Sequence, residues 1–274
     1  MSGPARVLVT GSTGNLGRKA VTALREADVD VVEVAADVPD GPDAVRADLS
    51  GFDPAWASAF HGVDAVLHLA ADRRPEAPWD SLQRLNVDLS MNVLRAAEEG
   101  QVRRFAFASS NWVLGGYRFT GERLTATTTP RPVNPYGVSK LVIERVGLAT
   151  AARTGMSFLA LRIGYCQPDD NLPGPDMLYG RWGQEMWLSN QDWAQAVCKA
   201  CTSRYEGSAV LHLMSDNVGM RWDLTDSDRV IGYRPASRHT PRLTLTGRLR
   251  DAAARLRDGL VQPLAPEPRF GGGW

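Results

Sequence analysis

Tyr136 and Lys140, in the segment YGVSK, are the residues whose types and spacing best suit proton transfer. Four residues apart in a helix, their side chains share one face. A free phenol has a pKa of about 10, and an ammonium group one turn away lowers that pKa and can also hold a nicotinamide ribose. Ser110 adds a hydroxyl where a strand-like segment ends, the edge at which open α/β sheets bind ligands. We expect these three residues to form the catalytic group.

A glycine-rich loop, TGSTGNLG, lies between the first strand-like segment and the first helical one. Gly11 can make the tight turn, Gly14 lets a pyrophosphate approach the backbone, and Gly17 permits close packing of helix on strand. The helix that begins at Asn15 and Leu16 offers free N–H groups and the positive end of its dipole to phosphates. The loop therefore predicts a dinucleotide-binding site.

The second strand-like segment is followed by Asp37, 20 residues after Gly17. A carboxylate there can bind the ribose hydroxyls of NAD and would repel the 2′-phosphate of NADP. The next basic residue is Arg46, so NAD is the expected cofactor. An alternative stays open, in which Asp37 is a solvated loop residue beside Asp40 and Asp43.

Other residues near strand ends are also expected beside the cofactor. Asp48 and Leu49 resemble a pair that borders the adenine. Leu69, Ala70 and Ala71 end an apolar strand with small side chains that leave room for the cofactor.

The elements that must position these residues alternate along the first two thirds of the chain. Short apolar segments alternate with amphipathic stretches, which is typical of a parallel sheet covered on both faces. Strands are expected at 6–10, 29–34, 63–69, 104–108, 158–163 and 210–214, and helices near 16–24, 82–93, 135–146, 191–201 and 249–260. The predicted fold class is α/β, a Rossmann-like doubly wound parallel sheet with helices on both faces and a small C-terminal substrate-binding part.

Three regions are expected along the chain. Residues 1–163 are predicted to be the NAD-binding Rossmann core, and residues 164–235 a small substrate-binding region interleaved with the last strands. Residues 236–274 are predicted to be a C-terminal helix and tail.

Composition narrows the class of protein. The 274 residues include 31 basic and 31 acidic side chains, and this balance argues against a nucleic-acid binder or a polybasic membrane protein. No apolar run approaches the roughly 18 residues of a transmembrane helix, and the first residues lack the apolar segment of a signal peptide. Three cysteines form no disulfide framework. We expect a cytoplasmic protein that binds neither nucleic acid nor membrane.

Several residues have a simpler structural interpretation. Cys198 and Cys201 lie on a predicted helix without a histidine or cysteine cluster around them, so packing is expected and no metal site. His68, inside a buried strand, is expected to be a core residue. The last helix carries an apolar stripe that we expect to contact a second copy of the chain; the stripe consists of Leu249, Ala253, Leu256 and Leu260.

The motifs together resemble the extended short-chain dehydrogenases/reductases of the NAD-dependent epimerase/dehydratase family. TGSTGNLG, HLAA, RLNVDLS, FASSNWVLG and YGVSK follow one another in that family's order. FASSN, YGVSK, LRIG and MWLSNQDW are more narrowly similar to uronate dehydrogenases and to archaeal NAD-dependent sugar and sugar-phosphate dehydrogenases. The resemblance covers about residues 5–235.

This resemblance implies roles for individual residues. Tyr136 would be the base, Lys140 its partner and Ser110 the hydroxyl that binds the reacting oxygen. Asn86 and Ile163 would join the cofactor contacts. The implied substrate contacts are Arg73, Ser110, Asn111, Trp112, Tyr165 and Arg181.

The substrate side departs from the family pattern. Trp112 stands where uronate dehydrogenases have a substrate-binding histidine, and Tyr165 stands where they have a small serine. Arg73 follows the strand that ends in Leu69, and Arg181 corresponds to the arginine that pairs with the substrate carboxylate. We therefore expect an anionic small sugar held by arginine; the alternative is that Arg73, Arg74 and Arg181 are solvated loop residues. Aromatic residues also gather here, and they either line the substrate site or belong to the core; they are Trp112, Tyr117, Tyr165, Tyr179 and Trp182.

The expected function is NAD-dependent oxidation of a sugar hydroxyl, at the anomeric carbon of a uronic acid or related sugar, to a lactone. The first alternative is a nucleotide-sugar epimerase or dehydratase that retains its NAD. About 110 residues follow Ile163, which is little for a cap that must bind a nucleotide. The second alternative is a regulatory NAD-binding protein without catalysis, against which the complete set of Ser110, Tyr136 and Lys140 argues.

Overall fold

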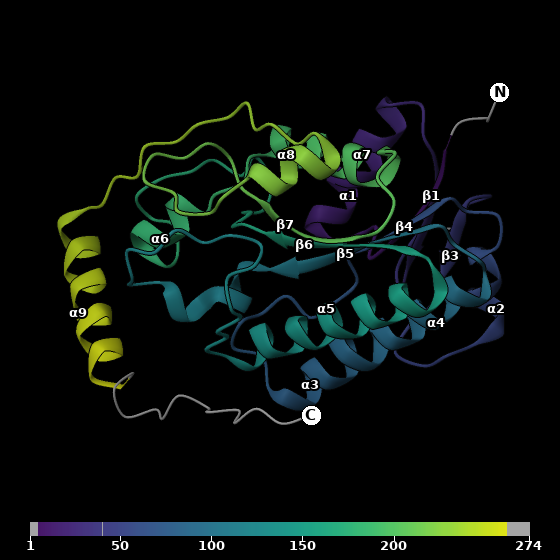
Figure 1. The fold of residues 1–274 in the computed structure, drawn as a ribbon, viewed down its shortest axis with the longest axis horizontal. Coiled ribbons are helices and arrows are strands. Elements are labelled where there is room, and N and C mark those ends of the chain that lie inside the picture. The colour runs from purple at the N-terminus through teal and green to yellow at the C-terminus, as the bar shows by residue number, and fades with distance from the viewer. Residues whose placement is uncertain (1–4, 40, 262–274) are drawn as a thin grey trace.

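Seven parallel strands form one sheet at the centre of the molecule, in the order β3-β2-β1-β4-β5-β6-β7 (Figure 1). The structure is a computed structural model that describes residues 5–39 and 41–261. The strand order reverses between β1 and β4, and the carboxyl ends at such a point are where open α/β sheets bind ligands. The strands are β1 (Arg6–Thr10), β2 (Asp30–Ala35), β3 (Ala44–Arg46), β4 (Ala65–His68), β5 (Arg104–Ser110), β6 (Ser157–Ile163) and β7 (Ser208–Leu213).

Helices cover both faces of this sheet (Figure 1). On one face, α1 and α7 pack together, with α8 beside them; on the other lie α2, α4 and the long α5. The helices are α1 (Asn15–Glu26), α2 (Pro54–Ala57), α3 (Trp79–Leu82), α4 (Leu89–Glu99), α5 (Pro135–Thr154), α6 (Gly180–Glu185), α7 (Asn190–Thr202), α8 (Thr225–Ile231) and α9 (Leu245–Val261). The predicted Rossmann-like fold class is confirmed.

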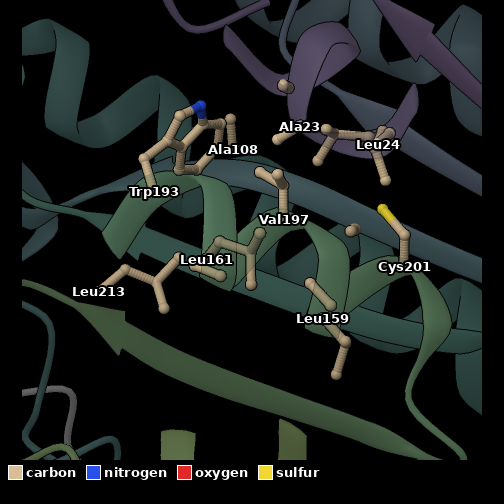
Figure 2. Close-up of a cluster of buried hydrophobic side chains, with 14 of the residues drawn as sticks. Ala23, Leu24, Ala108, Leu159, Leu161, Trp193, Val197, Cys201 and Leu213 are labelled. Atoms are coloured by element: carbon tan, nitrogen blue, oxygen red, sulfur yellow. The ribbon is translucent and has the colours of Figure 1, made fainter. Parts of the chain in front are cut away.

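The core between α7 and the sheet shows what the apolar periodicity achieves (Figure 2). Trp193 and Val197 of α7 are fully buried against Leu161 of β6 and Leu24 of α1. Cys201 lies in the same cluster, and its neighbour Cys198 packs at its edge. Packing, as predicted, accounts for both cysteines.

Several elements differ from the sequence expectation, among them the short helices α2, α6 and α8, which were not predicted. The edge strand β3 escaped prediction because it has three residues, all at least partly exposed, and so lacks an apolar run. The helix expected near 82–93 is instead α3, a π-helical turn over Gln83–Asp88, and α4. Because β7 pairs with β6, the 164–235 region shares the main sheet; its role as the substrate-binding part stays a prediction.

The C-terminal helix α9 packs on α6 at the side of the molecule. Leu249 and Leu256 on its apolar stripe are exposed, and the side chain of Leu260 lies outside the described residues. The second copy of the chain expected on this stripe therefore stays a prediction. Among the described helices, none is both long and apolar enough to span a bilayer.

Candidate active site

The glycine loop turns sharply between β1 and α1. Gly11 has a φ of +67°, and a Cβ there would lie 2.8 Å from the backbone nitrogen of Ala70. A Cβ on Gly17 would lie 2.1 Å from the carbonyl oxygen of Gly11. Both positions therefore need glycine, the first for its φ and both for the close approach of neighbouring backbone.

The same loop has the features that a dinucleotide requires. A Cβ on Gly14 would meet a single neighbouring atom, the Gly11 carbonyl oxygen at 3.2 Å, so the backbone is open on that side. The buried Ser12 hydroxyl has no hydrogen-bond partner among the described residues. Gly14 caps α1, whose first residues Asn15 and Leu16 place free N–H groups at this turn. The residues present fit the pyrophosphate of NAD.

Replacing Gly14 and Gly17 by alanine, one at a time, should separate the role of the loop in binding the cofactor from its role in the fold. We expect Gly17→Ala to lower both the melting temperature and the affinity for NAD, because its Cβ would overlap the Gly11 carbonyl. Gly14→Ala should keep the melting temperature and weaken NAD binding, because its Cβ projects where the pyrophosphate is expected. Thermal unfolding and NAD titration measure both, and unchanged NAD affinity in Gly14→Ala would place the pyrophosphate elsewhere.

The ends of β2 and β4 border this loop. Thr13 donates a hydrogen bond to the exposed carboxylate of Asp37 over 2.5 Å, which holds Asp37 beside the phosphate loop. The Thr10 hydroxyl accepts hydrogen bonds from the N–H groups of Leu69 and Ala70, at 3.2 and 3.3 Å. These contacts bring the end of β4, with Ala71 following, alongside the glycine turn.

Asp48 and Leu49 follow β3 on the far side of β2. The Asp48 carboxylate accepts the Ser50 N–H at 3.0 Å, and hydrogen bonds with Ser50 hold the pKa of Asp48 below its usual value. Leu49 is buried, and its carbonyl accepts a bond from Asn92. Their expected place beside the adenine stays a prediction.

His68 is confirmed as a core residue. Its ring nitrogens lie 2.7 Å from the Thr10 hydroxyl and 2.9 Å from the Ser90 hydroxyl. Burial lowers the pKa of His68 to about 3, so the ring is neutral.

The candidate catalytic residues meet where β5 ends and α5 begins. Asn134 caps α5 by accepting the Gly137 N–H at 2.7 Å, which sets the first turn that carries Tyr136. Ser110, the last residue of β5, lies close enough to the Tyr136 phenol to influence its pKa. The Lys140 ammonium lies 5.7 Å from the centre of the Tyr136 ring. Two elements separated by a crossover thus bring the three residues together.

Burial dominates the electrostatics of this group. It raises the pKa of Tyr136 to about 12 and lowers that of Lys140 to about 7, while the nearby Ser110 hydroxyl works against the rise at Tyr136. With these values, the phenol is protonated at neutral pH in the protein alone. Activation of Tyr136 as a base therefore requires positive charge close to it, from protonated Lys140 and from the oxidised nicotinamide ring of bound NAD.

A buried ion pair anchors α5 to the sheet, and the sequence analysis did not anticipate it. Glu144 lies one turn after Lys140, and its carboxylate accepts bonds from Arg162 of β6 at 2.9 and 2.8 Å and from the Ser109 hydroxyl at 2.5 Å. Both charged side chains are 2% exposed. The signal in the sequence is a charged residue in each of two segments that otherwise read as buried.

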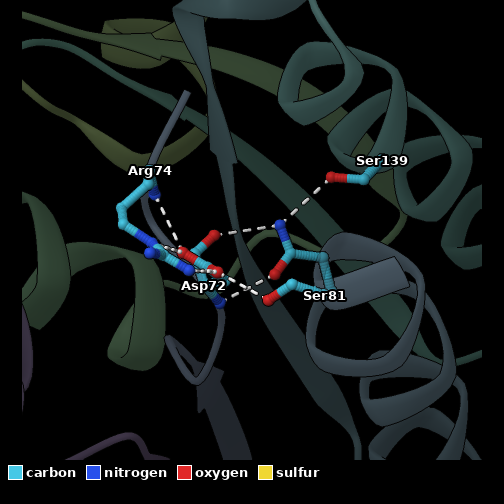
Figure 3. A network of polar contacts seen from close by, with 5 residues as sticks. Asp72, Arg74, Ser81 and Ser139 are labelled. Carbon is cyan, nitrogen blue, oxygen red and sulfur yellow. Dashed lines mark hydrogen bonds and ion pairs between the residues drawn. The ribbon is translucent and has the colours of Figure 1, made fainter. Parts of the chain in front are cut away.

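A second network ties the end of β4 to α5 (Figure 3). The Asn86 side chain accepts the Asp72 N–H at 2.8 Å and donates to the Asp72 carbonyl at 3.0 Å and to the Ser139 hydroxyl at 3.1 Å. Ser139 in turn bonds to the carbonyl of Tyr136. Asn86 thus joins the two segments that carry candidate site residues, and its expected contact with the cofactor stays a prediction.

Asp72 is a site residue that sequence reasoning did not single out. Its carboxylate accepts bonds from the Arg74 side chain at 3.0 and 2.6 Å and from the Ser81 hydroxyl at 2.7 Å (Figure 3). These contacts hold the pKa of Asp72 well below its usual range, so it is ionised. Asp72 also lies close enough to Tyr136 for its negative charge to raise the phenol's pKa.

The expected substrate residues fall into a buried and an exposed set. Asn111 is 1% exposed and donates to the Ile163 carbonyl at 2.8 Å, at the ends of β5 and β6. Arg73 is exposed, and Arg181 is exposed with its guanidinium 3.9 Å from Glu185. The structure therefore brings Asn111 to the end of the sheet beside Ser110 and leaves both arginines at the surface.

The aromatic residues do gather into one cluster. Trp112 contacts Tyr179 edge-to-face at 4.9 Å and Trp182 at 5.4 Å, and Tyr179 lies 6.0 Å from Tyr165. Trp182 and Tyr117 are buried in the core of this cluster. Tyr179 is half-buried, has a φ of +67° and lies close enough to Tyr136 to influence its pKa. Trp182 and Tyr117 thus belong to the core, while Tyr179 is half-buried at the edge of the cluster.

Comparison with known proteins gives one consistent picture. The model of the NAD dependent epimerase/dehydratase family matches residues 7–165. L-arabinose 1-dehydrogenase (NAD(P)(+)) of Haloferax volcanii is 35% identical, over 84% of this chain and 96% of its own. NAD-dependent glucose-6-phosphate dehydrogenase of the same organism is 34% identical, over 84% and 92%.

A solved structure extends the comparison to the fold and the cofactor. A mutant uronate dehydrogenase from Agrobacterium tumefaciens, complexed with NAD, is 25% identical and superposes with a TM-score of 0.71, over 97% of this chain and 92% of its own. The resemblance to extended short-chain dehydrogenases and the expected cofactor, NAD, are thereby confirmed. The chain belongs to the NAD dependent epimerase/dehydratase family.

Proposed function

We propose that this chain is an NAD-dependent sugar dehydrogenase that oxidises the anomeric hydroxyl of a sugar to a lactone. The observation that carries the proposal is the meeting of Ser110, Tyr136 and Lys140 at the carboxyl end of the sheet, next to a glycine loop that fits NAD. The relatives support the reaction class, because they are dehydrogenases named for arabinose, glucose 6-phosphate and uronate.

Each residue has a defined task in this reaction. The turn from Gly11 to Gly17 holds the pyrophosphate, and Asp37 and Lys140 bind the two riboses. Bound NAD supplies the acceptor for the hydride that leaves the anomeric carbon. The Tyr136 phenolate takes the proton of the substrate hydroxyl on its Oη, and the Ser110 hydroxyl donates a hydrogen bond to the oxygen that becomes the carbonyl.

The epimerase or dehydratase alternative has less support. Two relatives that match over most of both chains are dehydrogenases, whereas the UDP-glucose 4-epimerase of Streptomyces lividans matches over 51% of its own length. The complete catalytic group also argues against a purely regulatory protein. Net production of NADH from a sugar distinguishes a dehydrogenase from an epimerase, which returns the hydride to its product.

A substrate screen tests the proposal directly. The purified protein is incubated with NAD and a panel of neutral aldoses, uronates and sugar phosphates, and NADH formation is followed by absorbance. We expect NADH with at least one sugar and a lactone as product. Interconversion of a nucleotide sugar without net NADH, or no reaction with any sugar, would contradict the proposal.

Asp37 predicts the choice between the two nicotinamide cofactors. We expect kcat/KM with NAD to exceed that with NADP by about tenfold or more, since a carboxylate near the 2′-phosphate costs at least about 1.4 kcal/mol. Asp37→Asn should lower the ratio of kcat/KM with NAD to kcat/KM with NADP. Asp43→Asn, which removes a carboxylate paired with Arg6 before β3, is the matched control and should leave it unchanged. Equal use of both cofactors by the unaltered enzyme would show that Asp37 does not contact the ribose.

A further inference from the structure

Asp72 and Arg74 form an ion pair whose two side chains differ widely in exposure. The Asp72 carboxylate is 6% exposed, whereas the Arg74 side chain that pairs with it is 61% exposed. Water screens an exposed charge far more than a buried one. The pair therefore keeps its negative partner inside the protein, while the positive partner faces solvent.

The position of Asp72 is well defined by its surroundings. Asn86 binds both the N–H and the carbonyl of Asp72 and reaches Ser139, three residues after Tyr136 (Figure 3). Arg74 and Ser81 bind the carboxylate itself. Both the main chain and the side chain of Asp72 are thus held next to the first turn of α5.

The arginines on the α6 side of the site are already engaged with the protein. Arg118 donates to the Tyr179 carbonyl at 3.1 Å and lies 3.7 Å from the Asp251 carboxylate. Arg181 lies 3.9 Å from Glu185. A bound anion would have to compete with the Asp251 carboxylate for the Arg118 guanidinium.

The polar groups at the end of β5 favour hydroxyl donors over anions. Asn111 uses its amide N–H on the Ile163 carbonyl, and its buried Oδ1 has no donor among the described residues. A sugar hydroxyl can donate to this oxygen, whereas a carboxylate or phosphate oxygen has no proton to give and is repelled by it. The half-buried rings of Trp112 and Tyr179 suit the apolar CH face of a sugar.

From these four observations we propose that the substrate is a neutral sugar and that Asp72 excludes the matching uronate and sugar phosphate. The inference rests on the proposed dehydrogenase function and names its substrate class. It departs from the anionic sugar expected from Arg73 and Arg181 in the sequence, because the charged residue that Asn86 ties to the first turn of α5 is Asp72 rather than an arginine.

Matched pairs of substrates test this without assuming which sugar is used. Glucose with glucuronate, galactose with galacturonate, and glucose with glucose 6-phosphate differ only at carbon 6, and kcat/KM with NAD is measured for each member. We expect the neutral member to exceed the anionic one by at least about tenfold in the pair that reacts best. Preference for the anionic member overturns the inference alone, and no NADH from any sugar overturns the proposed function on which it rests.

Two variants with opposite expected effects assign the preference to Asp72. Asp72→Asn keeps the shape and removes the charge, so the ratio of neutral to anionic kcat/KM should fall about tenfold. Arg74→Gln leaves the Asp72 charge uncompensated, so the ratio should rise, and this variant remains informative if Asp72→Asn is poorly folded. Asp30→Asn removes the partner of Arg6 at the opposite end of the sheet and should leave the ratio unchanged. An unchanged ratio in both site variants with normal melting temperatures overturns the role of Asp72.

Discussion

Replacing Tyr136 with phenylalanine is expected to lower kcat by at least about a hundredfold, because a positioned base contributes that much or more. The substitution removes one oxygen atom. The ring can stay packed near Lys140, so the melting temperature and the affinity for NAD should change little. Steady-state kinetics with the best sugar of the screen, thermal unfolding and NAD titration measure the three quantities.

Tyr205→Phe provides the matched control for this prediction. Tyr205 precedes β7, and its hydroxyl binds the carbonyl of Ser208 at the amino end of that strand, the end of the sheet opposite Ser110. We expect normal kcat in this variant. Turnover by Tyr136→Phe within a few-fold of the unaltered protein would remove Tyr136 from the role of base.

Removing the buried carboxylate of Glu144 should produce the largest loss of stability. Glu144→Ala leaves the Arg162 guanidinium at the centre of the protein without its charge partner, and breaking a buried pair in this way costs about 3–5 kcal/mol. Because the pair joins α5 to β6, the loss should appear as a lower free energy of unfolding in urea.

Glu98→Ala is the control for the ion pair. Glu98 of α4 pairs over 2.5 Å with Arg153 of α5, the helix that also carries Glu144. Both side chains of this pair lie at the surface, where water screens the interaction. Its free energy of unfolding should change much less than that of Glu144→Ala. Equal losses in the two variants would show that the buried pair contributes no more than a surface one.

Local spacing explains which parts of the site were predictable from the sequence. The three glycines Gly11, Gly14 and Gly17 lie close together along the chain, as do Tyr136 and Lys140. Local backbone geometry alone therefore sets the relative positions of the residues within each motif. The alternation of apolar segments likewise predicted β1, β4, β5 and β6, because buried strands and amphipathic helices leave a periodic signal. The three-residue strand β3 leaves none.

Contacts between distant segments needed the tertiary structure. Glu144 and Arg162 lie on different elements, and nothing in their spacing indicates that one carboxylate neutralises one guanidinium between α5 and β6. The aromatic cluster likewise draws Trp112, Tyr165 and Tyr179 from three separate segments. The sequence therefore left open whether these rings line the site or fill the core.

The sequence by itself determined the fold class and the cofactor and predicted the catalytic group, since each depends on motifs within short stretches of chain. The tertiary structure decided the contacts that the charged and polar residues around the candidate site make. The arginines among the three consecutive charged residues after Ala71 suggested an anion site in the sequence. In the fold, Arg74 instead binds the Asp72 carboxylate, and Asn111 donates its amide N–H to the Ile163 carbonyl. Contacts between distant residues decide which charges are paired and which hydrogen-bond acceptors are left without a donor. The spacing of residues along the chain does not specify these contacts.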